Sequence, residues 1–351
     1  MKEQEERKEQ RKTSIGGQAL LGGVMMKSPT GMAMSVRKEN GEVSTSYEEY
    51  TPWMKKNKFF SLPLVRGCVN FLESLVIGFK MMNKSAEALD LEEESEEPSK
   101  FEIWLSERLG AKVEDVVMGI GMVLGVLLAV GLFMVLPSFV ASFFKPVLTT
   151  AWKTNLVEGA LRMLIFLGYL IAIAHMKEIK KVFQYHGAEH KTIACYEHGL
   201  DMTVENAKKQ SRLHPRCGTN YLFLVMLISI FCFSLLGYNG HWIGKVALRL
   251  LLLPVVAGVS YEVLRWAGLY DNVITRIVRW PGMKLQLITT AEPSDDQLAV
   301  AIEAFEWALD PKEAAEKDRN GYYPTLYPMT EKEKQADEAS TKPAVPEGDM
   351  A

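Results

Sequence analysis

Residues 116–136 read VVMGIGMVLGVLLAVGLFMVL, a run of 21 residues without a charged side chain. An α-helix needs about 20 apolar residues to cross the hydrocarbon core of a bilayer. A buried helix of a large soluble core is the alternative, but the run also holds several glycines, which membrane-spanning helices tolerate. The run therefore predicts a membrane-spanning helix.

Three further apolar windows bring the expected spans to four, at about Val116–Leu136, Leu156–Met176, Tyr221–Leu236 and Ile243–Leu264. The mean hydropathy of the chain is near zero because densely charged ends offset these windows. The expected fold class is an α-helical integral membrane protein whose partner is the lipid bilayer. The net charge of −3 gives no reason to expect a nucleic-acid partner.

The loops between these spans differ in their basic residues. Lysine and arginine are concentrated in residues 177–220, which hold Lys177, Lys180, Lys181, Lys191, Lys208, Lys209, Arg212 and Arg216. Residues 137–155 hold only Lys145 and Lys153. Because loops rich in Lys and Arg stay on the cytoplasmic side, residues 177–220 and both termini are expected to be cytoplasmic, in a multi-pass protein of the plasma membrane.

A small cytoplasmic β-sheet is expected from the N-terminal part. Asn40-Gly41 separates two β-prone runs, 32–38 and 42–50, and Asn-Gly at such a place is typical of a hairpin. Residues 19–26 are expected to form a further short strand. Because an isolated hairpin is marginal in water, these strands need further partners.

The expected partner strand lies after the last span. In residues 283–290, Leu285 and Leu287 alternate with polar neighbours, which predicts a strand that joins the same sheet. Ser294 and Gln297 then form a capping-box pattern that opens a helix through Ala308.

The expected segments follow from these patterns: a disordered tail at 1–14, a cytoplasmic β-hairpin segment at 15–58, an amphipathic helix at 59–83, an acidic linker at 84–100, a four-helix membrane domain at 101–268, a C-terminal strand and helix at 269–309, and a disordered tail at 310–351. The amphipathic helix is expected to begin near Ser61 and Pro63. It either lies on the membrane surface or packs onto the other helices.

Chemistry is expected in the His-rich loop 177–220, which holds four of the six histidines. His186 and His190 are four residues apart, so on a helix both imidazoles lie on one face, a spacing that suits a shared metal ion. With Glu189 the string reads His-x-x-Glu-His. This is the inverted form of the zinc-protease motif, in which both histidines bind metal and the glutamate is the general base.

Other residues extend this candidate site. His214 and Cys217 follow in the same loop, and imidazole and thiolate both suit zinc. Alternatively, the histidines hold loops by hydrogen bonds, or Cys217 is a nucleophile with Arg216 favouring its thiolate and His214 or His190 as base. Glu262 lies at the cytoplasmic end of the fourth span and is a further candidate ligand or base, or an interface anchor.

A resemblance covers about residues 15–305. The matching pieces are Gly16-Gly17-Gln18-Ala19, Val24-Met25-Met26, Pro63-Leu64-Val65-Arg66-Gly67, Tyr185-His186-Gly187-Ala188-Glu189-His190-Lys191, His214-Pro215-Arg216-Cys217-Gly218-Thr219, Ser260-Tyr261-Glu262, Pro281-Gly282 and Thr289-Thr290. Through them the chain resembles the YqhQ-like family of bacterial integral membrane proteins, a domain-of-unknown-function family of predicted metal-dependent enzymes. The chain departs from the family's pattern at Gly22, where a glutamate commonly stands, so any chemistry that needs this glutamate would be altered here.

These patterns lead to one expected function and one alternative. The first is a membrane-embedded enzyme that depends on zinc or another divalent transition metal and hydrolyses an amide or ester, in a lipid or membrane-protein substrate. The expected metal ligands are His186, His190, His214 and Cys217, and the expected catalytic residues are Glu189 and Glu262. The alternative is a non-catalytic membrane scaffold or assembly protein in which the same metal is structural.

The orientation can be tested by cysteine labelling. In intact cells, a membrane-impermeant thiol reagent is expected to label single cysteines placed at 238–241 and to miss those placed at 200–210, because the basic residues hold the second segment inside. Labelling of the second segment and protection of the first would reverse the orientation.

Overall fold

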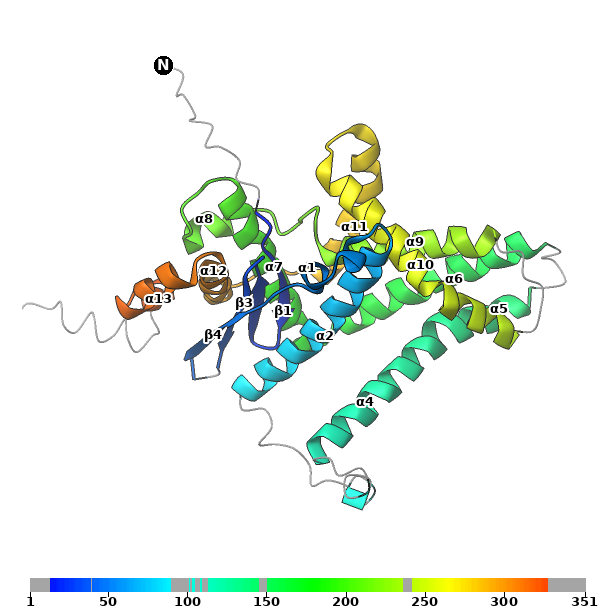
Figure 1. Ribbon diagram of the computed structural model, residues 1–351, viewed down its shortest axis with the longest axis horizontal. Coiled ribbons are helices and arrows are strands. Elements are labelled where there is room, and N and C mark those ends of the chain that lie inside the picture. Colours follow the sequence, from blue (N-terminus) through cyan, green and yellow to red (C-terminus); the bar gives the residue numbers. More distant parts are fainter. Residues whose placement is uncertain are drawn as a thin grey trace, which may run out of the picture.

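The computed structural model describes residues 13–38, 40–89, 101, 103–104, 108, 113–144, 150–235 and 242–327. A small sheet with its covering helices forms one end of the molecule, and the long apolar helices extend away from it (Figure 1). Residues 1–12, 90–100 and 328–351, which hold most of the two expected tails and of the acidic linker, lie outside the described residues.

Four antiparallel strands form the sheet in chain order, β1 (Gly16–Leu20), β2 (Gly23–Lys27), β3 (Gly31–Arg37) and β4 (Val43–Glu49). The expected hairpin around Asn40-Gly41 is confirmed, because β3 pairs with β4 and places Ser35 opposite Thr45. Gly41 has a φ of 90°, the left-handed conformation that suits glycine in such a turn.

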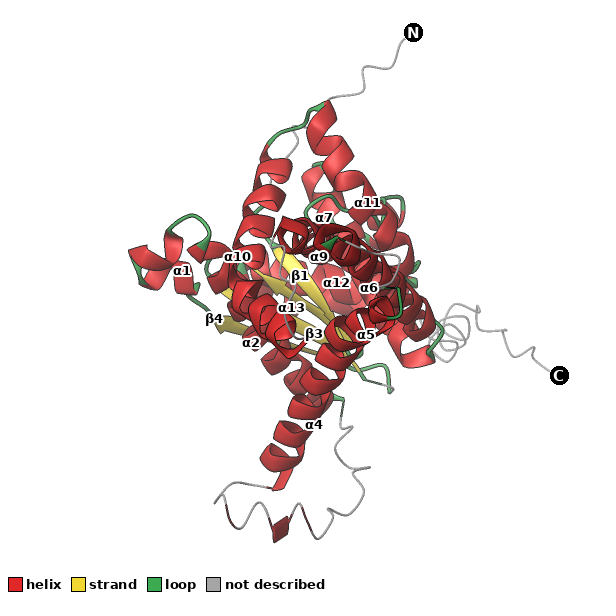
Figure 2. Cartoon of the chain, turned by 90° about the vertical axis from the view of Figure 1, so that its right-hand side faces the viewer, coloured by secondary structure: helices red, strands yellow, loops and turns green. Residues whose placement is uncertain are grey.

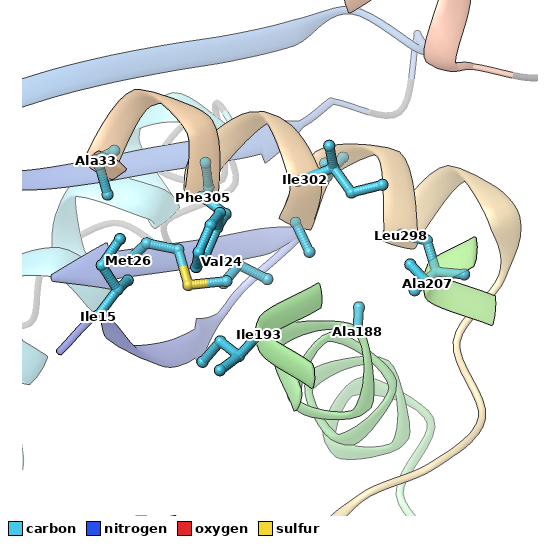
Figure 3. Close-up of a cluster of buried hydrophobic side chains, with 14 of the residues drawn as sticks. Ile15, Val24, Met26, Ala33, Ala188, Ile193, Ala207, Leu298, Ile302 and Phe305 are labelled. Carbon is cyan, nitrogen blue, oxygen red and sulfur yellow. The ribbon is translucent and has the colours of Figure 1, made fainter. Parts of the chain in front are cut away.

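Helices cover both faces of the sheet, so the strands lie deep among them (Figure 2). Side chains alternate between the faces of a strand. Val24 and Met26 of β2 therefore pack with α7 (Lys177–Glu197) and α12 (Asp295–Leu309), as Figure 3 shows. Met25, on the other face, packs with Ile77 and Met81 of α2 (Val65–Ala88). The sheet therefore fixes the position of α7, the helix that carries His186 and His190, relative to α2.

Within the described residues, four helices are long and apolar enough to cross a membrane, at Gly119–Ser142, Trp152–Ala174, Gly218–Leu235 and Val246–Leu269. They belong to α4 (Val113–Val130) with its continuation through the π-helical turn Gly131–Val135 into α5 (Leu136–Ser142), to α6 (Ala151–Ala174), to α9 (Gly218–Leu235) and to α10 (Trp242–Leu269). Each overlaps an expected span, so the expected helices are confirmed. Between α6 and α9 the chain forms α7 and α8 (Val204–Lys208), so most of the expected His-rich loop is helical.

Buried ionic and polar contacts join these apolar helices. Arg249 of α10 forms an ion pair with Glu158 of α6 and also donates to Ser138 Oγ at 2.8 Å. Arg162 of α6 donates to the Phe133 carbonyl oxygen at 2.7 Å. A charged side chain inside an apolar bundle needs such partners, so these contacts fix α6 against its neighbours.

Helix α2 begins at Val65, after the expected start at Ser61, because Lys58–Ser61 forms a separate 3-10 turn. Its inner face, which includes the buried Glu73, packs on the sheet and on α10. The outer face exposes Leu72, Leu75, Val76 and Phe79. Of the two arrangements expected for this helix, packing onto other helices is observed for its inner face. The outer face is apolar and exposed.

Residues 283–290 are not a strand, and this prediction was wrong. They end α11 (Val273–Thr289), a helix that encloses Pro281. Leu285 and Gln286 both lie on its buried face, whereas Leu287 is exposed. The apparent alternation arose because a polar glutamine occupies the inner face of a helix.

The segment after α11 is more regular than expected. The capping box of Ser294 and Gln297 is confirmed at the start of α12. The disordered tail expected from residue 310 is wrong for its first part, where α13 (Pro311–Arg319) and a 3-10 turn (Tyr323–Leu326) follow. Asp310 caps α13 by accepting the N–H groups of its first turn.

A substitution of Gly187, in the middle of α7, can test how closely this helix packs. An added Cβ would lie 2.1 Å from the Ala291 carbonyl oxygen. Gly187→Ala is therefore expected to destabilise the fold by about 1–3 kcal/mol through overpacking, although alanine is the better helix former. Thermal unfolding of the purified protein in detergent measures the effect.

The matched control is Gly168→Ala in α6, where no described atom lies within 4 Å of an added Cβ. This variant should unfold at or above the temperature of the parent protein. Equal destabilisation at both positions would contradict the close contact at Ala291.

Candidate functional site

Helix α7 carries the first two residues of the candidate site. His186 and His190 lie one turn apart on one face, and their ring centroids are 4.4 Å apart. His190 is 1% exposed, and His186 is half-buried. Gly187 lies in close contact with the segment after α11, so this part of α7 packs tightly against the rest of the protein. The helix therefore delivers both imidazoles to a protected place.

Two backbone carbonyl groups orient the rings. His186 Nδ1 lies 2.8 Å from the Thr289 carbonyl oxygen, and His190 Nδ1 lies 2.6 Å from the Arg212 carbonyl oxygen. A carbonyl oxygen only accepts, so each neutral ring carries its proton on Nδ1. Both Nε2 atoms are then left with a lone pair, and an Nδ1–H held by a backbone carbonyl is the usual arrangement of histidines that bind metal.

Cys217 completes a three-atom cluster. Its sulfur lies 3.2 Å from His186 Nε2 and accepts the Thr219 N–H at 3.4 Å. Cys217 directly precedes α9, so its sulfur lies at a helix start, where negative charge is favoured. The ligand atoms of His186, His190 and Cys217 all lie within 4.8 Å of one another.

The cluster lines the wall of a cavity of about 860 Å³ between α2, β1, α7 and the start of α9. Glu189 lines the same cavity, and its Oε1 accepts the Gly17 N–H at 2.9 Å. A Cβ on Gly17 would lie 2.7 Å from the Glu189 side chain, so only glycine lets β1 approach α7 this closely. The strand thereby holds the expected general base in the cavity.

His214 lies beside the cluster and faces another partner. Its ring centroid is 5.6 Å from that of His190, and its Nε2 lies 3.5 Å from Glu197 Oε2. Glu197 also forms an ion pair with Arg216 and accepts the Thr13 N–H at 3.3 Å. Burial alone would raise the pKa of Glu197, but the contacts with His214 and Arg216 outweigh it and lower the pKa to about 2.

Two other positions singled out from the sequence are not part of the cluster. Glu262 forms an ion pair with Arg66 and is not among the residues that line the cavity. The structure thus places Glu262 beside Arg66 and does not bring it to the cavity wall, and its expected role as ligand or base stays a prediction. Gly22 lies in the turn between β1 and β2 with a φ of 64°, and it too is absent from the cavity wall. Position 22 is therefore not part of the cavity wall.

Comparison with known proteins assigns the chain to a family. The family model described as "Protein of unknown function (DUF1385)" matches residues 62–311, more than half of the chain. The chain belongs to this family. It is 33% identical over 293 residues to the "Uncharacterized protein YqhQ" of Bacillus subtilis (strain 168), a match that covers 83% of this chain and 91% of that protein. The resemblance seen in the sequence is thus confirmed, and no solved structure matches the chain.

Gln286 of α11 is a site residue that sequence reasoning missed. It is fully buried; its Oε1 accepts the His214 N–H at 2.8 Å, and its Nε2 donates to the His214 carbonyl oxygen at 2.8 Å. The same Nε2 donates to Asn220 Oδ1 at 3.0 Å. Gln286 therefore holds the backbone of His214 before Cys217 and the side chain of Asn220 after it. The one available signal was a polar residue in line with the apolar positions of an amphipathic helix.

The low pKa of Glu197 predicts a pH dependence of stability. The folded-state value of about 2 lies below the ordinary 4.5, so the carboxylate stabilises the fold fully above that pH and progressively less as the pH falls toward 2. Glu197→Gln is expected to cost about 1–2 kcal/mol at neutral pH, less than the full linkage because solvent screens the group. Urea unfolding in detergent at several pH values measures both effects.

The control is Glu205→Gln, which removes an exposed carboxylate paired with Lys209 in the next turn. This variant should keep the stability and acid profile of the parent protein. A Glu197→Gln protein that lost stability in acid as steeply as the parent would show that Glu197 is not the titrating group.

Proposed function

We propose that this chain is a membrane-embedded, metal-dependent hydrolase whose site lies at the cytoplasmic face of the plasma membrane. The observation that carries the proposal is the convergence of His186, His190 and Cys217 ligand atoms within 4.8 Å on the wall of a large cavity. Three protein ligands beside open space are the arrangement of a catalytic zinc site, which keeps a fourth position for water or substrate.

The donor set suits zinc, which takes neutral imidazole and thiolate ligands. His190 Nε2 is buried and has no hydrogen-bond partner in the described part of the chain. Such an unsatisfied atom costs about 1–3 kcal/mol, and a bound cation removes that cost. The 3.2 Å between His186 Nε2 and Cys217 Sγ is also near the separation, about 3.5 Å, of two ligands in a tetrahedral site.

The residues of the chain have separate tasks in this proposal. When bound, zinc supplies a Lewis acid that polarises a carbonyl oxygen. Glu189 accepts a proton from the attacking water and returns it to the leaving group. Its carboxylate keeps lone pairs for this task because the Gly17 N–H uses only one of them. Gly17 and β1 keep the carboxylate oriented.

The membrane part of the proposal is supported by the four candidate spans and by the place of the site. Cys217 directly precedes Gly218, the first residue of a candidate span. The basic residues of 177–220 favour the cytoplasmic side for this end of α9. A substrate with one part in the bilayer, a lipid or a membrane protein, can therefore bring its polar part to the cavity.

The second candidate function is a scaffold with a structural metal. His214 favours it, because its ring centroid lies only 5.6 Å from that of His190, and structural zinc has four protein ligands. In that case no coordination position stays open for water or substrate.

Metal analysis of the purified protein tests the proposal. About one zinc per chain is expected, and His186→Ala, His190→Ala and Cys217→Ala should each lose most of it, because three ligands leave little redundancy. The matched control is His175→Ala, whose exposed ring lies 2.7 Å from the Ile171 carbonyl oxygen and apart from the cluster. Loss of metal in the control alone, or in none of the variants, would refute the site.

Two further variants separate enzyme from scaffold. If the site is catalytic, Glu189→Gln should keep the metal, and hydrolysis of an ester or amide probe should fall about 100-fold or more. His214→Ala should then also keep the metal. If His214→Ala loses the metal while Glu189→Gln behaves as the parent protein does, the scaffold is favoured.

A further inference from the structure

Helix α11 has two faces of opposite character. Gly282, Leu285, Gln286 and Thr289 are buried against α9 and the site. The other face exposes large apolar side chains, with Val273 at 71%, Ile274 at 63%, Ile277 at 66% and Trp280 at 61%. No described part of the chain covers these four side chains. A contiguous exposed apolar face of this kind marks a surface that meets another partner.

The position of α11 indicates which partner this is. The helix starts at Val273, directly after the candidate span that ends at Leu269. Exposed aromatic side chains gather at this junction, Trp266 and Tyr270 before α11 and Trp280 within it. Trp and Tyr are enriched where a protein crosses the boundary between bilayer and water. In Figure 1, α6 and α9 run away from the sheet, and the α10–α11 hairpin projects across their direction.

The charge of α11 fits an anionic lipid surface. Residues 271–287 contain Arg276, Arg279 and Lys284 but only one acidic residue, Asp271. Asp271 pairs with both arginines, which leaves the segment with a net positive charge. An amphipathic helix with basic residues beside an apolar face binds in the plane of a membrane, and anionic lipids strengthen the binding.

We propose that α11 lies on the cytoplasmic surface of the bilayer, with its apolar face among the lipid head groups and its basic residues against anionic lipid. This inference rests on the membrane part of the proposed function and is independent of metal and catalysis.

The inner face of α11 gives this placement a consequence for the site. The Thr289 carbonyl oxygen orients His186, and Gln286 holds the backbone of His214. The helix that meets the lipid surface is therefore the helix that positions the candidate ligands. A lipid-borne substrate would reach a site whose geometry is set by an element already in contact with lipid.

Photo-crosslinking tests the placement in the full chain. A photoreactive phenylalanine analogue replaces Ile277 in the proposed lipid-facing surface, or Glu313, an exposed residue of α13, as the control. Each protein is reconstituted in nanodiscs of zwitterionic lipid or of zwitterionic lipid mixed with phosphatidylglycerol. The probe at 277 is expected to form several-fold more lipid adducts than the probe at 313, with a further increase in the anionic discs.

Lipid adducts at 277 no more frequent than at 313 would overturn the inference, as would adducts at 277 that consist mainly of a second copy of the chain. A photoreactive residue at Leu127, a 62% exposed position within the first candidate span, distinguishes failure of the surface-helix proposal from failure of membrane insertion. Lipid adducts at 127 without those at 277 would reject the surface helix alone. Absence of both would reject membrane insertion, whereas loss of metal in the ligand variants bears only on the enzyme.

Discussion

The hydrogen bonds from His186 and His190 to two backbone carbonyl groups are the interaction on which the candidate site depends. A histidine ring that is free to turn offers either nitrogen to solvent, whereas these two rings are held so that both Nε2 atoms face Cys217. The carbonyl groups belong to Thr289 and Arg212, far from α7 in the sequence. The site therefore exists only when α11 and the turn before α9 are in place.

Close backbone packing makes this dependence possible. Gly17 lets β1 approach Glu189, and Gly187 lets the segment after α11 lie against α7. At both places a Cβ would meet atoms within 3 Å, so the contacts allow little adjustment. The sheet matters for the same reason, since its two covered faces fix α7 and α2 on opposite sides. The cavity between these helices follows from this spacing.

Local patterns predicted much of this structure. The apolar windows indicated the four long helices, Asn40-Gly41 the hairpin, and the spacing of His186 and His190 a shared helical face. The errors came where tertiary contacts override local pattern. Gln286 looked like the outward residue of a strand because its partners, the backbone groups of His214, lie 72 positions away. Glu262 was singled out by its depth in a span, and its ion pair with Arg66 of α2, far away in the sequence, could not be read from that position.

The position of Cys217 connects the chemistry to the membrane. Cys217 directly precedes Gly218, the first residue of a candidate span, so a candidate ligand atom lies next to the start of that span. A soluble substrate would not need this arrangement, because its site could lie anywhere on the surface outside the candidate spans. A site next to the start of a candidate span, beside a helix with an exposed apolar face, would instead shorten the path that a substrate takes from the bilayer to the cavity. In the proposed enzyme, this arrangement would suit a substrate that stays partly in the lipid phase.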